Sequence, residues 1–118
     1  MIRLIKNANV DDIKRELSRL MHVGSQRQDV RDFALSIVPN YNDDQISAVY
    51  SYVKTNVRYQ PDPTSSELFV APWKLVELVK LGRAAEDCDG ISLFCSTLYR
   101  SLGYQARLAL LDIQGEGI

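Results

Sequence analysis

The residue best placed for covalent chemistry is Cys88, in the run Glu86-Asp87-Cys88-Asp89-Gly90. Apolar residues recur at helical spacing after this run, which predicts a helix that begins at Cys88 with Asp87 as its cap. The first N–H groups of a helix lack internal partners and carry partial positive charge, so they stabilise a thiolate and can hold an oxyanion. Cys88 is therefore a candidate nucleophile, and the backbone N–H groups of Cys88 and Asp89 are candidate oxyanion donors.

A cysteine nucleophile needs a base, and the residues around Cys88 are carboxylates. Like charges disfavour a thiolate, so Glu86, Asp87 and Asp89 oppose the effect of the helix terminus. The single histidine, His22, lies far upstream, where a surface or packing role is the simpler interpretation. A metal site built from Asp87, Cys88 and Asp89 is disfavoured because adjacent helical positions diverge and the ligand set matches no common geometry. The local sequence leaves a buried structural cysteine and a nucleophile both open, and predicts no cofactor.

The second cysteine, Cys95, falls on the apolar stripe of the same predicted helix and is expected in the core. Seven residues at about 1.5 Å rise would place the two Cα atoms about 10 Å apart. A disulfide requires less than about 7 Å. Two independent thiols are therefore predicted, as in proteins of a reducing compartment.

Apolar periodicity predicts five helices and one strand. The first helix is capped by Asn9 and ends at 24–26, and the second covers 28–38. The third is capped by Asn42 or Asp43 and runs to Val57. The fourth begins at Pro72 and is stopped by Gly82, and the fifth runs from Asp87 to Gly103. The third helix carries an apolar stripe expected in the core, namely Ile46, Val49, Tyr50, Val53 and Val57. Residues 57–63 should be extended, 64–66 a polar loop, and 104–112 a buried strand.

Composition predicts one globular domain over residues 1–118, and periodicity predicts that its N-terminal part, residues 1–42, is helical. The chain has 46% hydrophobic and 25% charged residues. A formal net charge of −1 without a basic stripe argues against nucleic-acid binding. No apolar run reaches the roughly 20 residues that span a bilayer, so no membrane segment is expected.

Several of these residues together resemble the core signature of the transglutaminase-like superfamily. The resemblance covers about residues 43–112. The acid-flanked cysteine, Asp87-Cys88-Asp89, is most similar to bacteriophage and prokaryotic members. Its most specific part is Cys88-Asp89-Gly90 followed by Leu93, Leu98, Arg100, Gly103, Ala106 and Arg107. A weaker part precedes the cysteine, at 57–59, 62–63, 67–68 and Pro72.

This resemblance implies a papain-like α+β fold in which the cysteine helix leads into an antiparallel sheet. It also implies a Cys-His-Asp triad in that chain order. Cys88 would form a thioester with a protein or peptide substrate, and the reaction would be acyl transfer or hydrolysis. No histidine follows Cys88, so the expectation is a domain truncated before its histidine and aspartate, with an incomplete sheet and no activity of its own. The alternative is a non-catalytic binding or virion structural module on the same fold. Self-association through an exposed sheet edge and a cytoplasmic or virion-associated location are also expected.

Overall fold

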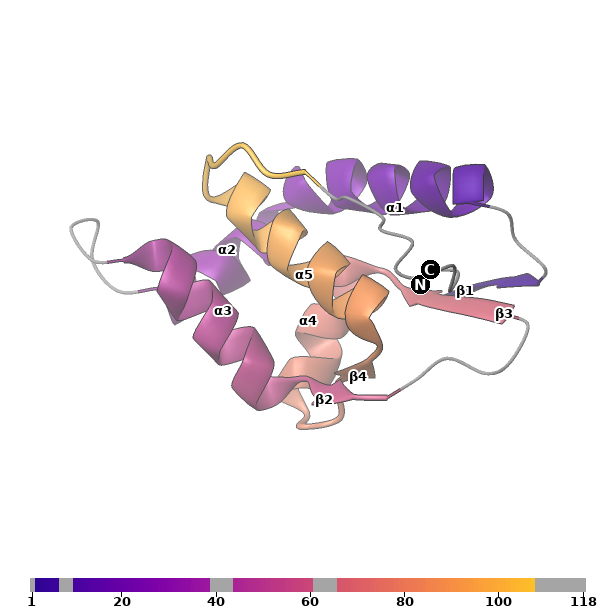
Figure 1. Ribbon diagram of the computed structural model, residues 1–118. Helices are drawn as coiled ribbons and strands as arrows, with labels where there is room; N and C mark the ends of the chain where they lie inside the picture. The colour runs from indigo at the N-terminus through magenta and orange to yellow at the C-terminus, as the bar shows by residue number, and fades with distance from the viewer. Residues whose placement is uncertain (1, 7–9, 39–43, 61–65, 108–118) are drawn as a thin grey trace.

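Five helices make up most of the described chain, and the last of them, α5, lies between the other four (Figure 1). The computed structural model describes residues 2–6, 10–38, 44–60 and 66–107. The helices are α1 (Val10–Ser25), α2 (Gln28–Ile37), α3 (Gln45–Asn56), α4 (Pro72–Lys80) and α5 (Cys88–Ser101). The five predicted helices are therefore confirmed, and none of those in the described ranges is long and apolar enough to cross a bilayer.

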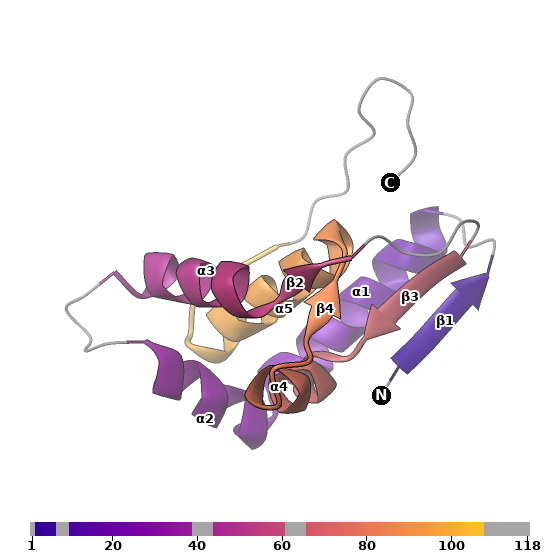
Figure 2. The same ribbon diagram turned by 90° about the horizontal axis from the view of Figure 1, so that it is seen from below.

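Two separate pairs of strands accompany the helices (Figure 2). β1 (Ile2–Lys6) pairs with β3 (Ser66–Val70) in antiparallel register, with Ile2 opposite Val70. β2 (Arg58–Tyr59) pairs with β4 (Ala85–Glu86) in parallel register. The extended exit predicted after α3 is thus confirmed at β2, whereas β1, β3 and β4 were not predicted, and Ser66 belongs to a strand rather than to the expected loop.

The core surrounds α5 and consists of two apolar clusters bridged by Trp73. The larger cluster has as buried members Val30, Phe33, Ala34, Val49, Val53, Val57, Val70, Leu75, Val76, Val79, Ala84, Phe94 and Leu98. The smaller cluster has Ile13, Leu17, Leu20, Met21, Ala71 and Leu93. α1 and α2 thus contribute to different clusters, α2 to the larger one and α1 to the smaller one.

The third helix differs from the prediction at its start and on one face. Its N-cap is Asp44, whose side chain accepts a hydrogen bond from the Ser47 N–H at 3.0 Å, whereas the predicted caps lie outside the described residues. Val49, Val53 and Val57 are buried as predicted, but Ile46 and Tyr50 are 50% and 56% exposed. The stripe was predicted too wide: α5 covers one side of the helix and leaves these two side chains uncovered.

A compact turn follows α5 where a strand was predicted. Gly103 has φ +98, and the N–H groups of Gly103 and Tyr104 donate to the carbonyls of Arg100 and Tyr99, both at 3.0 Å. This is the Schellman arrangement, in which a left-handed residue ends the helix and reverses the chain. Residues 104–107 are irregular, so that part of the strand prediction is wrong, and 108–112 lie outside the described residues. The antiparallel sheet expected after the cysteine helix is not confirmed.

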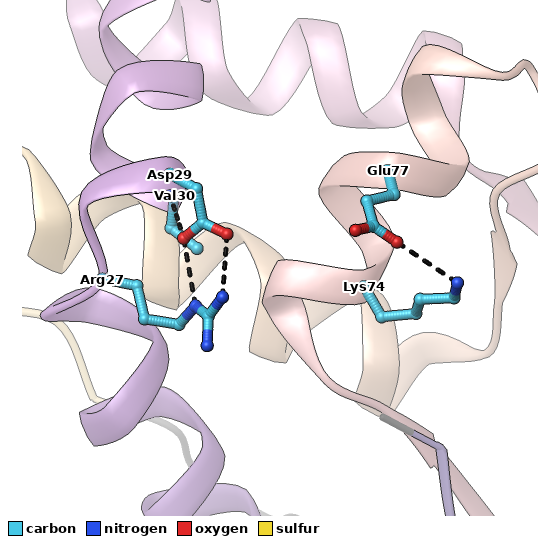
Figure 3. Close-up of polar contacts among 5 residues, drawn as sticks. All are labelled: Arg27, Asp29, Val30, Lys74 and Glu77. Carbon is cyan, nitrogen blue, oxygen red and sulfur yellow. Dashed lines mark hydrogen bonds and ion pairs between the residues drawn. The ribbon is translucent and has the colours of Figure 1, made fainter.

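Two ion pairs lie on this side of the molecule, one at the turn between α1 and α2 and one on α4 (Figure 3). Arg27 donates to both carboxylate oxygens of Asp29 at 3.0 Å, and its guanidinium lies 4.9 Å from the centre of the Trp73 ring. On α4, Lys74 forms an ion pair with Glu77 at 3.2 Å. The hydrogen bonds from Arg27 hold the pKa of Asp29 below its usual value. Because these groups are exposed, they orient the turn more than they stabilise it.

Candidate functional site

The start of α5 is built as the sequence predicted. Asp87 caps the helix: its backbone is extended, and its side chain accepts a hydrogen bond from the Gly90 N–H at 2.9 Å. The Asp87 carbonyl accepts the first helical hydrogen bond, from the Ile91 N–H, also at 2.9 Å. Cys88 is thus the first helical residue, so its own N–H and that of Asp89 have no carbonyl partner within the helix.

The Cys88 thiol is accessible but is not activated by its surroundings. The residue is exposed, and its Sγ donates to Oδ1 of Asp89 at 3.8 Å. Partial burial of the sulfur raises the pKa of Cys88, and the negative charges of Asp89 and Asp87 raise this pKa further. Burial and the neighbouring Asp87 also raise the pKa of Asp89. Burial and the two carboxylates together hold the pKa of Cys88 above its usual value, so a thiol rather than a thiolate predominates at neutral pH.

Replacing Asp89 with asparagine is expected to lower the pKa of Cys88. The substitution removes the nearer of the two negative charges, so below this pKa the thiolate fraction and the alkylation rate should rise about two- to fivefold. The measurement is the rate of reaction with iodoacetamide against pH, in a Cys95→Ser background. Asp32→Asn, a similar change on α2, is the control and should leave the rate unchanged. A rate that falls or stays constant in Asp89→Asn would contradict the prediction.

Behind the thiol, Glu86 occupies space that any residue other than glycine would need at position 90. Glu86 is 4% exposed, and its backbone carbonyl accepts a hydrogen bond from the Gln60 N–H at 2.8 Å. A Cβ atom on Gly90 would overlap with Oε2, Cδ and Cγ of Glu86. The glycine therefore allows a buried carboxylate to lie against the first turn of α5. Sequence reasoning treated Glu86 only as one of three charges around the cysteine and missed this packing role.

The second thiol is chemically distinct from the first. Cys95 is half-buried on α5, and burial raises its pKa to about 11. Both cysteines are free, as predicted. Cys95 packs against the larger apolar cluster, which confirms its predicted structural role. Within the described ranges, no group of three or more His, Cys, Asp or Glu side chains is placed to hold a metal ion.

The one histidine of the sequence does not lie beside Cys88. His22 is exposed in the last turn of α1. Two residues later, Gly24 approaches Thr97 so closely that a Cβ on this glycine would lie 2.9 Å from Cγ2 of Thr97. Thr97 follows Cys88 by nine residues, about 13.5 Å along the axis of α5. His22 therefore lies near the far half of α5, and the interpretation of it as a surface residue is confirmed.

An apolar groove of about 270 Å³ opens one helical turn from Cys88. It is lined by Tyr50, Val53, Lys54, Val57, Tyr59 and Ile91. Ile91 is three residues after Cys88, so the two side chains share a face of α5. Tyr59 belongs to β2 and lies opposite Glu86 of β4. Sequence reasoning did not assign this groove, because the residues that form it come from three separate elements.

A match to a protein-family model gives the chain's class. The family model described as transglutaminase-like superfamily matches residues 31–117, so the chain belongs to the transglutaminase-like superfamily. Membership indicates the α+β fold type of cysteine-protease-like and acyltransferase domains. The comparisons with curated proteins and with solved structures gave no significant match.

Proposed function

We propose that Cys88 is the nucleophile of an acyl-transfer or amide-hydrolysing enzyme that acts on a protein or peptide. The observation that carries the proposal is an exposed thiol on the first residue of a capped helix, in a chain of this family. The thiol is accessible, and the N–H groups of the first turn are oriented toward the same end of the helix, where charge would develop on a carbonyl oxygen.

In the proposed reaction, Sγ of Cys88 attacks the carbonyl carbon of a glutamine side chain or a peptide bond. A base removes the thiol proton and delivers it to the departing nitrogen, which leaves as ammonia or an amine. The resulting thioester reacts with an amine or with water, and the thiol is restored. The oxyanion that precedes each collapse is held by the N–H groups of Cys88 and Asp89.

The base in this proposal is an imidazole from outside the 118 residues, oriented by a carboxylate. A cation beside the thiol is needed because burial, Asp89 and Asp87 all raise the pKa of Cys88. An imidazolium would reverse that balance and form the thiolate. The 118 residues by themselves should therefore react with activated esters, whose leaving group needs no proton, and should fail with amides.

A second candidate function is a non-catalytic binding or virion structural module. The observation that favours it is the raised pKa of Cys88 in surroundings that contain carboxylates and, among the described residues, no imidazole. In such a module the thiol would have no chemical role. The two candidates differ in whether Cys88 forms a thioester.

The test is acylation of Cys88 by a p-nitrophenyl ester that mimics a glutamine side chain. Mass spectrometry of Cys95→Ser should show one acyl group on Cys88, whereas Cys88→Ser/Cys95→Ser should show none. Alkylation against pH should give a Cys88 pKa above the usual range. A Cys88 pKa below about 7 would refute the need for an external imidazole. Absence of acylation at pH values where Cys88 is alkylated would favour the non-catalytic module.

A further inference from the structure

A second groove, which the proposed chemistry does not use, lies at the start of the β2–β4 pair and carries only positive charge. Its volume is about 590 Å³, and the charged side chains along it are Lys54, Arg58 and Arg83. Among the described residues that line it, none is acidic. The remaining lining is uncharged, from Thr55 and Asn56 to Gly82 and Ala84.

The three cations of this groove differ from four others on the surface that carboxylates neutralise. Arg15, Arg19, Arg27 and Lys74 each form an ion pair with a carboxylate within three residues in the sequence. Lys54, Arg58 and Arg83 have no ion-pair partner among the side chains that the structure describes, in the ranges 12–38, 44–60 and 70–107. Lys54 lies 5.9 Å from the centre of the Tyr50 ring, which leaves its charge unneutralised. The groove therefore presents an uncompensated positive field to an anionic ligand.

The β2–β4 pair leads from this groove to Cys88. The Arg58 N–H donates to the Ala84 carbonyl at 3.0 Å, and the next rung joins Gln60 to Glu86, two residues before the thiol. Arg83 and Cys88 are five residues apart, so at most about 18 Å separates their Cα atoms. The apolar groove beside Cys88 shares Lys54, Val57 and Tyr59 with the cationic groove. The two grooves therefore adjoin, and Ile91 of the apolar groove lies one helical turn from Cys88 on the same helix; we call the thiol and the two grooves the track.

Charge changes sign along this track. Asp87 and Asp89 lie at the thiol end, the apolar groove follows, and the three cations lie at the other end. A nucleic-acid strand carries uniform negative charge and would be repelled at the thiol end. An extended peptide can carry a neutral glutamine at one end and carboxylates about five residues away, which matches all three sections of the track.

We propose that the groove of Lys54, Arg58 and Arg83 binds an acidic segment of the polypeptide substrate. The proposal rests on the proposed function, because it assigns the occupant as the donor whose carbonyl reacts with Cys88. The carboxylates of the segment pair with Arg58 and Arg83, an apolar side chain occupies the groove of Tyr50, Tyr59 and Ile91, and the reacting group reaches the thiol. Substrate selection is thus electrostatic at a distance from the reacting atom.

The test is binding of fluorescein-labelled decapeptides to the 118-residue Cys88→Ser variant, measured by fluorescence anisotropy. One peptide carries a glutamine and, from five residues away, three glutamates; the matched peptide carries three glutamines there. We expect the acidic peptide to bind more tightly, and Arg58→Gln/Arg83→Gln to weaken it roughly tenfold, about threefold for each charge. Lys14→Gln/Arg100→Gln, a control pair of exposed cations on α1 and α5, should change binding less than twofold.

Three results would overturn the proposal. The first is equal affinity for the two peptides. The second is equal weakening of peptide binding by Arg58→Gln/Arg83→Gln and by the control substitutions. The third is tighter binding of a ten-residue oligothymidylate or of inorganic phosphate than of the acidic peptide. Because these measurements use Cys88→Ser, they do not depend on chemistry. Failed binding with intact ester acylation rejects the groove and leaves the proposed nucleophile standing. Binding without acylation rejects the nucleophile, and with it the assignment of the bound acidic peptide as a substrate.

Discussion

Replacing Phe94 with alanine is expected to cost about 3–5 kcal/mol of unfolding free energy, the range for removing a buried aromatic side chain. Phe94 is fully buried at the centre of α5, and its ring stacks on Phe33 of α2 with centroids 6.0 Å apart. The cavity would lie at the junction of α5 with its neighbours, so collapse around it would move several helices. Urea denaturation followed by circular dichroism gives the change.

The matched control for Phe94 is Tyr59→Ala, which removes an aromatic side chain that is 61% exposed and should change stability by less than about 0.5 kcal/mol. If Phe94→Ala does not fold, Phe94→Leu keeps most of the volume and should lose about 1–2 kcal/mol. Similar losses of unfolding free energy in Phe94→Leu and Tyr59→Ala would show that α5 is not the centre of the core.

Replacing Gly90 with alanine is expected to destabilise the protein by about 1–3 kcal/mol, the usual cost of overpacking. In an ordinary helical position the same change stabilises by roughly 0.5–1 kcal/mol. At position 90 the change in stability should have the opposite sign, because the new Cβ would overlap with the buried carboxylate of Glu86. Displacing Glu86 would also disturb the bond from the Gly90 N–H to Asp87, so the rate of Cys88 alkylation should change as well.

A double-mutant cycle isolates this contact. In Glu86→Ala/Gly90→Ala the overlap disappears, so the double variant should be more stable than the sum of the single changes predicts, by at least about 1 kcal/mol. Ser92→Ala, at an exposed position of the same helix, serves as the control for helix propensity. Additive effects, or a more stable Gly90→Ala, would show that Glu86 moves away without cost.

The helices and their ends could be predicted because their determinants are local. Asp87 caps α5 through the Gly90 N–H, three residues away, and Gly103 ends the same helix with a positive φ. Capping and helical periodicity depend on residues within one or two turns, so they can be read from a single sequence. The resemblance carried by Cys88-Asp89-Gly90 and the residues after it was equally local, and the family match confirms it.

The strand pairs could not be predicted, because each depends on a distant partner. Ile2 lies opposite Val70 across an interval that contains α1, α2 and α3, and Arg58 lies opposite Ala85 across one that contains β3 and α4. β2 and β4 have only two residues each, too few to show an alternating pattern. The predicted stripe of α3 failed at Ile46 and Tyr50 for a related reason: helical periodicity identifies an apolar face but not how much of it a neighbour covers.

The sequence by itself determined that Cys88 begins a helix, that carboxylates surround it, and that Cys95 faces the core. Each of these follows from chemistry within a few residues. Only the tertiary structure decided the balance of charge at the thiol, since burial of the sulfur raises its pKa in addition to the two carboxylates. It also brought Tyr50, Tyr59 and Ile91 together into one groove, and Lys54, Arg58 and Arg83 into another. Burial and long-range electrostatics depend on which elements pack together, and α5 makes those contacts with residues distant in the chain.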